Sequence, residues 1–254
     1  MNKIEKQFLK HILKIDDVQL LLLDEIPKEA LEQLEIFLNR YNKGEPFAYI
    51  VNEVNFMGLD FFVDENVLIP RQETELLVEE ILKYLDKSPK ARILDICTGS
   101  GCILVSILKL SENCVGTGVD ISDEALKIAR KNATTHGIEC ELIKSDMLEN
   151  ISEKYDIVIS NPPYIKTEDM LELEISVKEY EPHLALDGGK DGLHFYKIIR
   201  NNFENILLPN GVLFLEIGYN QGNDIVLLFE GFDVEIKKDY SGFDRIAIVK
   251  RIVL

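Results

Sequence analysis

Apolar residues recur at helical spacing in the first part of the chain. Up to residue 43 they form two stripes: Phe8, Leu9, Ile12 and Leu13, then Leu31, Leu34, Ile36, Phe37 and Leu38. A repeat of three to four residues is typical of amphipathic helices, and Pro27 fits the first turn of the second one. We therefore expect residues 1–43 to form a small helical domain, with Gly44 as its natural stop.

The pattern changes between residues 44 and 85. Residues 46–70 are rich in aromatic and β-branched side chains and carry Gly58 at a turn, a composition that predicts a β-hairpin. A helical repeat returns between Thr74 and Leu85. We expect residues 44–85 to form a hairpin linker followed by a connecting helix.

Strand and helix patterns alternate over residues 86–254. Apolar runs that predict strands lie at 91–97, 114–120, 140–146, 155–160 and 212–218, with β-rich runs at 232–238 and 245–253. Helical patterns lie at 103–108, 122–137, 167–180 and 193–207. Near-continuous apolar strands that alternate with helices are typical of a parallel sheet covered on both faces, so we predict an α/β fold.

The net charge of the chain disfavours two classes of partner, nucleic acids and anionic membranes. The chain has 254 residues, 46% of them hydrophobic, with 28 Lys and Arg against 45 Asp and Glu, so its formal net charge is −17. Contacts to phosphates need clustered basic residues, and an anionic bilayer would repel this chain, so we expect no direct nucleic acid and no membrane as partner. No apolar run approaches the roughly 18 residues of a membrane span, and the N-terminus lacks the apolar core of a signal peptide. We expect a cytoplasmic protein and, since no long heptad or repeat suggests assembly, a monomer.

The cysteines and histidines form no metal-binding pattern. The four cysteines are Cys97, Cys102, Cys114 and Cys140, and none belongs to a CxxC pair. The four histidines are scattered, so we expect no metal site. We interpret the cysteines as reduced thiols of a cytosolic protein.

A glycine-containing loop, Asp95–Gly101, joins the first predicted strand of this region to its first helix. Glycines there let the backbone approach a ligand, and the helix N-terminus favours a negative group. The dinucleotide fingerprint fails because Leu104 occupies the position of its third glycine, and no Gly-Lys-Ser/Thr of a P-loop follows. The loop predicts a ligand without a pyrophosphate; an ordinary tight turn is the alternative.

Two acidic residues end the next predicted strands. Asp120 lies 19 residues after Gly101, where a carboxylate can take two ribose hydroxyls. Asp146 could accept a hydrogen bond from the exocyclic amine of adenine while Met147 covers the ring. Asp146 could equally be a helix N-cap.

Asn161-Pro162-Pro163-Tyr164 directly follows the fourth of these strands, at the edge where open α/β sheets bind ligands. The prolines hold the backbone extended, so the Asn161 side-chain oxygen and the Pro162 carbonyl can converge on one NH₂ group. Tyr164 offers a flat face for a planar amide or base. Two acceptors on one NH₂ group localise the nitrogen lone pair and aim it at an electrophile such as a sulfonium methyl.

Together these features resemble class I S-adenosylmethionine-dependent methyltransferases that act on planar nitrogens. The fuller resemblance, over nearly the whole chain, is to the HemK/PrmC family of peptide chain release factor glutamine N5-methyltransferases. It includes Glu45–Ile50, which resembles the start of the family's hairpin, and further segments at Ile69–Glu75, Tyr180–Leu186, Asp187–Gly192 and Asp239–Arg245. It implies a Rossmann-like, mostly parallel sheet with an antiparallel C-terminal strand, behind a small N-terminal helical domain and a β-hairpin linker.

The resemblance also implies a role for each motif. Residues expected to bind S-adenosylmethionine are Cys97, Thr98, Gly99, Ser100, Gly101, Asp120, Asp146, Met147 and Asn161. Among them the loop borders the methionine part, Asp120 the ribose, and Asp146 with Met147 the adenine. Residues expected to hold the substrate are Asn161, Pro162, Pro163 and Tyr164, of which Asn161, Pro162 and Tyr164 are the implied catalytic residues.

Some positions depart from the family pattern or allow two interpretations. Cys97 stands where a glycine often lies, and Met147 where an aromatic residue is common; a small thiol and a flexible thioether both still permit binding. Residues 70–75 either line the ligand pocket or pack between domains.

The reaction implied is methyl transfer from S-adenosylmethionine to the side-chain nitrogen of the glutamine in the Gly-Gly-Gln motif of class 1 release factors, leaving S-adenosylhomocysteine. The alternatives are a glutamine of a ribosomal protein and an adenine N6 or cytosine N4 of nucleic acid, which also present planar NH₂ groups. A binding protein without catalysis is a further alternative. The acidic charge of both parts of the chain disfavours nucleic acid.

Overall fold

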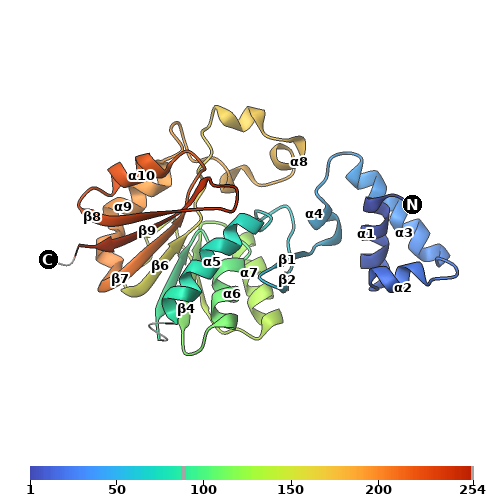
Figure 1. Ribbon diagram of the computed structural model, residues 1–254, viewed down its shortest axis with the longest axis horizontal. Coiled ribbons are helices and arrows are strands. Elements are labelled where there is room, and N and C mark those ends of the chain that lie inside the picture. The colour runs from blue at the N-terminus through green and yellow to red at the C-terminus, as the bar shows by residue number, and fades with distance from the viewer. Residues whose placement is uncertain (87–89, 253–254) are drawn as a thin grey trace.

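The computed structural model describes residues 1–86 and 90–252, and it places a group of N-terminal helices beside a larger α/β unit (Figure 1). The N-terminal helices are α1 (Lys3–Leu13), α2 (Asp17–Leu21) and α3 (Lys28–Tyr41). Capping boxes begin the first two, where Asn2 pairs with Glu5 and Asp16 with Gln19. Their apolar stripes meet in a small core of their own, built from Phe8, Leu9, Leu20, Ala30, Leu34 and Ile50.

The hairpin prediction for residues 46–70 was wrong at both ends. The segment opens with a short helix, α4 (Phe47–Val51), and only β1 (Val54–Phe56) and β2 (Leu59–Phe61) form the hairpin. Glu45–Ile50 therefore does not start a hairpin. Tertiary burial explains the difference, because three successive residues, Ala48 to Ile50, are all buried and no half-exposed strand allows that.

The larger unit contains one seven-stranded sheet in the order β5-β4-β3-β6-β7-β9-β8. Its strands are β3 (Arg92–Ile96), β4 (Val115–Asp120), β5 (Glu141–Lys144), β6 (Tyr155–Ser160), β7 (Leu207–Glu216), β8 (Phe232–Lys238) and β9 (Asp244–Arg251). Neighbours from β5 to β7 pair in parallel, and β9 runs antiparallel to both β7 and β8. This confirms the mostly parallel sheet with an antiparallel C-terminal strand; residue 253 of the last predicted run lies outside the described residues.

Helices cover both faces of the sheet, as predicted (Figure 1). One face carries α5 (Gln72–Leu85), α6 (Cys102–Leu110) and α7 (Asp123–His136), and the other carries α9 (His194–Ile206) and α10 (Gly222–Leu228). Alternate residues of a strand point to opposite faces, so Val212 and Phe214 join the first core while Leu213 and Leu215 join the second. Two apolar layers thus hold the strand ends in fixed positions.

Four elements differ from the sequence-based expectations. The helix predicted over 167–180 is reduced to a 3₁₀ turn, η1 (Asp169–Glu172), and to α8 (Ile175–Lys178), because Met170 is the one buried side chain of these two pieces. A further 3₁₀ turn, η2 (His183–Ala185), and the helix α10 were not predicted. β7 begins at Leu207, five residues early, and a register shift opposite Tyr155 accommodates its irregular start.

Candidate active site

A cavity of about 450 Å³ opens at the carboxyl ends of β3, β4 and β6. The strand order reverses between β3 and β6, since β4 and β5 extend the sheet on one side of β3, and β6 and β7 extend it on the other. Open α/β sheets bind ligands at such a reversal. Nine of the predicted site residues line it: Cys97, Thr98, Gly99, Ser100, Asp120, Asp146, Met147, Asn161 and Pro163. Gly101, Pro162 and Tyr164 lie beside it and do not line it.

The glycine loop turns sharply under the cavity because three of its residues adopt left-handed backbone conformations: Cys97, Gly99 and Gly101, with φ of 61°, 55° and 78°. A Cβ on Gly99 would meet no atom within 4 Å, so its glycine serves the backbone conformation. A Cβ on Gly101 would lie 3.1 Å from the Ala129 side chain. Gly101 therefore lets α6 pack closely against α7. It faces this contact between helices and not the cavity.

Asp120 ends β4 and holds the loop in place with its carboxylate. Its two oxygens accept hydrogen bonds from the backbone N–H groups of Gly99 and Ser122, each at 2.9 Å. Burial raises the pKa of Asp120, although these backbone donors oppose the shift. Each carboxylate oxygen retains a further lone pair, so the group can still accept two ribose hydroxyls from the cavity side.

Asp146 and Met147 form the wall beyond β5. No helix begins at Asp146, and its backbone carbonyl closes a turn with the N–H of Glu149 at 3.1 Å, so the capping interpretation fails. Met147 has φ of 48°, and its sulfur lies 3.7 Å from the Cys97 thiol. The two departures from the family pattern are thus neighbours, and both border the cavity.

Asn161 follows β6 and faces the cavity. Its Nδ2 donates to the hydroxyl of Thr74 at 3.5 Å, a residue of α5. With the nitrogen engaged in this way, the Oδ1 atom is the end of the amide that remains as an acceptor. Pro162 is buried, and Pro163 lines the cavity.

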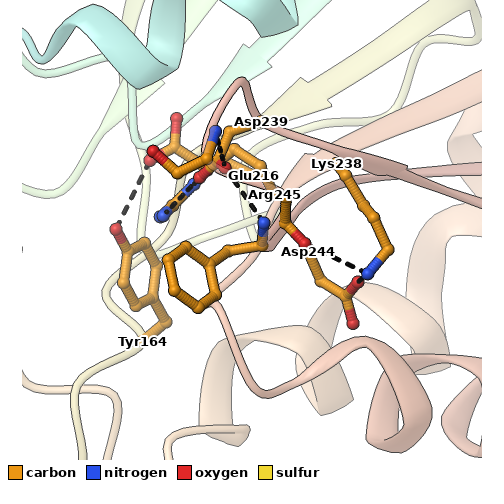
Figure 2. A network of polar contacts seen from close by, with 9 residues as sticks. Tyr164, Glu216, Lys238, Asp239, Asp244 and Arg245 are labelled. Atoms are coloured by element: carbon orange, nitrogen blue, oxygen red, sulfur yellow. Dashed lines mark hydrogen bonds and ion pairs between the residues drawn. The ribbon is translucent and has the colours of Figure 1, made fainter.

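Tyr164 turns away from the cavity toward β7. Figure 2 shows its hydroxyl directed at Glu216, and the Oη–Oε1 distance is 3.4 Å. Burial raises the pKa of Tyr164 well above its ordinary value, and the nearby Glu216 charge adds to the shift. The tyrosine is therefore a protonated donor to Glu216 in this structure, and its expected contact with the substrate stays a prediction.

Residues 70–75 both line the ligand pocket and pack against the segment that links the domains. Pro70, Arg71 and Thr74 line the cavity, while the Glu75 carboxylate accepts the backbone N–H of Met57 at 2.6 Å and so holds the hairpin. The segment thus connects the hairpin to the site.

Sequence reasoning missed an ion pair between Arg71, which lines the cavity, and the buried carboxylate of Glu181. The Arg71 guanidinium donates to the carboxylate of Glu181, whose other oxygen accepts the backbone N–H of Ile69 at 3.4 Å. Burial raises the pKa of Glu181, and Arg71 opposes that shift. Because the partners are 110 residues apart, no local pattern indicates the pair.

Glu216 was also missed, although it lies within a predicted strand and ends β7. A carboxylate inside the apolar run 212–218, at the edge where ligands bind, is the signal that could have found it. It is 2% exposed, and burial raises its pKa to about 6, while the Thr74 hydroxyl, Arg245 and the Tyr164 hydroxyl oppose the shift.

Acidic side chains outnumber basic ones along the described lining of the cavity. Three acidic residues, Glu65, Asp120 and Asp146, line it, and Arg71 is the one lysine or arginine among the described lining residues. Over residues 1–86 and 90–252, no group of three His, Cys, Asp or Glu side chains could hold a metal ion. Within the same residues, no helix is both long and apolar enough to cross a membrane.

Known proteins resemble this chain along most of its length. Residues 72–181 match the family described as methyltransferase small domain, and residues 6–51 match the PrmC N-terminal domain. A release factor glutamine methyltransferase of Lactococcus lactis is 43% identical over 241 residues, which cover 93% of this chain and 85% of the relative. The enzyme of that name from Clostridium acetobutylicum is 38% identical, with 96% and 89% covered.

Solved structures share the fold at lower identity. A crystal structure of a methyltransferase from Pyrococcus furiosus aligns with a TM-score of 0.56 at 19% identity, covering 88% of this chain and 100% of that one. The two named relatives are more than 30% identical to this chain over most of the length of both proteins. The sheet order and the cavity at its carboxyl edge are consistent with this relationship. This chain belongs to the release factor glutamine methyltransferase family.

Proposed function

We propose that the protein transfers a methyl group from S-adenosylmethionine to the side-chain nitrogen (N5) of the glutamine in the Gly-Gly-Gln motif of class 1 release factors. The observation that carries the proposal is the placement of Asn161 at the cavity, with its Nδ2 engaged by Thr74 and its Oδ1 left as an acceptor. An amide NH₂ group needs such an acceptor, and the relatives from Clostridium acetobutylicum and Lactococcus lactis are named release factor glutamine methyltransferases.

The residues of the chain would bind the cofactor in three parts. Asp120 accepts ribose hydroxyls, Asp146 and Met147 border the adenine, and the loop from Cys97 to Gly101 runs beside the methionine portion. The geometry supports these roles because Asp120 is already fixed by two backbone donors and keeps free lone pairs toward the cavity. When bound, S-adenosylmethionine supplies a methyl group on a positively charged sulfur.

Asn161 and the Pro162 carbonyl would hold the two hydrogens of the substrate amide. This draws electron density back onto the amide nitrogen, whose lone pair is otherwise delocalised into the carbonyl, and orients that pair toward the methyl carbon. The N–C bond forms as the S–C bond breaks, and the nitrogen then loses one proton to water. No residue needs to act as a nucleophile, which agrees with the raised pKa of the nearby Cys102 thiol, about 12.

Purified protein, labelled S-adenosylmethionine and a class 1 release factor test the proposal directly. We expect label on the wild-type factor and none on a factor whose Gly-Gly-Gln glutamine is replaced by glutamate. Transfer to a ribosomal protein, DNA or ribosomal RNA with an unlabelled release factor would contradict it.

The proposal extends to the organisation of the chain. Residues 1–43 would select the substrate, residues 44–85 would link, and residues 86–254 would bind the cofactor. In support, Leu21 at the end of α2 and its C-cap Leu22 are 77% and 76% exposed, and the acidic residues Asp24 and Glu25 follow them in the chain, a combination suited to a protein partner. We also propose a cytoplasmic monomer that does not act on nucleic acid, supported by Cys97, Cys102 and Cys140, which form no disulfide, and by the net charge of −17.

A further inference from the structure

Asn161 can hold its substrate only if its amide group keeps one of two orientations. The Oδ1 and Nδ2 ends are similar in size, so shape alone does not choose between them. If Nδ2 faced the substrate NH₂ group, two donors would meet. Something in the protein must therefore fix the orientation of the Asn161 amide.

The sheet register places a carboxylate beside this residue. Ser160 of β6 pairs with Leu215 of β7, so the next residues along each strand, Asn161 and Glu216, follow at neighbouring carboxyl ends. Glu216 is buried, its backbone carbonyl accepts the Tyr196 hydroxyl at 2.8 Å, and its Oε1 accepts the Tyr164 hydroxyl at 3.4 Å. Its Oε2 has no hydrogen-bond partner within normal geometry.

Thr74 connects the two residues. It is 2% exposed on α5, which packs against β7, the strand that Glu216 ends, and its Oγ1 accepts from Asn161 Nδ2 at 3.5 Å. In agreement with this packing, the Thr74 hydroxyl opposes the rise in the pKa of Glu216 that burial causes. A carboxylate can only accept hydrogen bonds, so an ionised Glu216 draws the Thr74 hydroxyl proton toward itself. The lone pairs of the Thr74 oxygen then face Asn161 and select its NH₂ end.

We infer that Thr74 and Glu216 are positioning residues of the methyl transfer: Glu216 directs the Thr74 hydroxyl, and Thr74 directs the Asn161 amide so that Oδ1 faces the acceptor nitrogen. Glu216 does not line the cavity, and both residues act through Asn161. The inference rests on the proposed function, since it assigns the acceptor amide to that site.

The charged groups around Glu216 keep it ionised at neutral pH. Arg245 of β9 lowers its pKa and pairs with Asp239, which follows β8, at 3.1 Å; Figure 2 shows this pair beside Glu216. Glu73 of α5 and burial raise the pKa of Glu216, and the result is about 6. Below that pH a protonated Glu216 can donate to Thr74, which would then direct its own proton toward Asn161 and favour the wrong amide orientation.

Steady-state methylation by Thr74→Val and Thr74→Ser variants tests the Thr74 step. We expect Thr74→Val to lower kcat about tenfold, the equivalent of one ordinary hydrogen bond, with the KM for S-adenosylmethionine unchanged. Thr74→Ser keeps the hydroxyl and should stay within about twofold of wild type. Equal kcat for Thr74→Val and wild type would overturn the inference.

The pH profile of kcat tests the role of Glu216, because a merely structural role would not make kcat depend on the ionisation of this carboxyl. Wild-type kcat should fall as pH drops below about 6, and Glu216→Gln should be slower above that pH and lack the acidic limb. A Glu216→Gln profile that keeps the limb would overturn the role of the carboxylate. Thermal unfolding of each variant identifies any loss caused by misfolding.

A second measurement separates this inference from the proposed function. The side-chain amide resonances of Asn161, assigned by their absence in Asn161→Ala, can be recorded in the whole protein without any acceptor. They should shift in Thr74→Val and Glu216→Gln but not in Thr74→Ser. Unchanged resonances refute the positioning network, whereas an unlabelled release factor with shifted resonances refutes only the assigned substrate.

Discussion

The cofactor half and the acceptor half of the cavity are built in different ways. The cofactor half consists of short contiguous pieces: the loop from Cys97 to Gly101, Asp120 at the end of β4, and Asp146 with Met147 just after β5. The Asp120 carboxylate joins two of these pieces by accepting the N–H groups of Gly99 and Ser122. The acceptor half joins Thr74, Asn161 and Glu216, which lie on α5, β6 and β7 and meet only in the folded chain. Local segments therefore specify cofactor binding, and tertiary packing specifies the acceptor.

Each half also contains one fully buried carboxylate. Asp95 accepts the Thr98 hydroxyl at 2.6 Å under the glycine loop, and Glu216 accepts the Tyr164 hydroxyl beside Asn161. Burial raises the pKa of both, to about 7 for Asp95 and about 6 for Glu216. The two groups resemble each other chemically, but Asp95 shapes a backbone turn and Glu216 directs side chains.

The largest expected effect lies in the acceptor half. Asn161→Ala removes a positioned acceptor and should lower kcat by about 10²–10³-fold, as for other preorganised hydrogen bonds to a transition state. Calorimetry should show S-adenosylmethionine affinity little changed. Near-normal turnover by this variant would mean that the acceptor amide is held elsewhere.

A substitution in the cofactor half should change the affinity for S-adenosylmethionine. Asp120→Ala removes hydrogen bonds from a charged group to ribose, each contributing about 1.5–3 kcal/mol, so Kd for S-adenosylmethionine should rise at least tenfold. Asp123→Ala, three residues later and exposed in a surface pair with Lys144, is the matched control and should bind normally. Equal affinities for the two variants would remove Asp120 from the ribose site.

A third prediction compares the pH dependence of folding. Because the folded-state pKa of Asp95 is raised above its unfolded value, the folded protein binds the extra proton, and this group lowers stability as pH rises from about 4 to about 7. Asp95→Asn should remove that slope, up to about 1.4 kcal/mol per pH unit. Urea unfolding of both proteins at several pH values measures the difference; parallel curves would exclude a raised Asp95 pKa.

The smallest effect is expected far from the cavity. Replacing Leu21 and Leu22 with serine should raise the KM for release factor a few-fold by removing exposed apolar area, with kcat and cofactor affinity unchanged. Leu227→Ser on α10, also highly exposed, is the control. If the control variant changes KM equally, residues 1–43 do not select the substrate.

The same contrast explains what the sequence could and could not predict. The sheet, the helices α5, α6, α7 and α9, and the residues from Cys97 to Gly101 follow from apolar periodicity and a contiguous loop. The Arg71–Glu181 pair and the contact of Thr74 with Asn161 join residues 110 and 87 positions apart, so no periodicity indicates them. Helix α4 differs from its predicted strand for a related reason, since Phe47 and Tyr49 favour a strand locally, whereas tertiary packing buries the successive residues Ala48, Tyr49 and Ile50.

The irregular start of β7 also has a consequence for how this protein can vary. The register shift opposite Tyr155 lies at the amino end of the sheet, and pairing from Val212 to Leu215 is then continuous up to the active site. Extra residues near Pro209 would be absorbed before the regular pairing begins, whereas one residue inserted after Val212 would move Glu216 out of line with Asn161. Changes in chain length should therefore be tolerated at one end of this strand and selected against at the other.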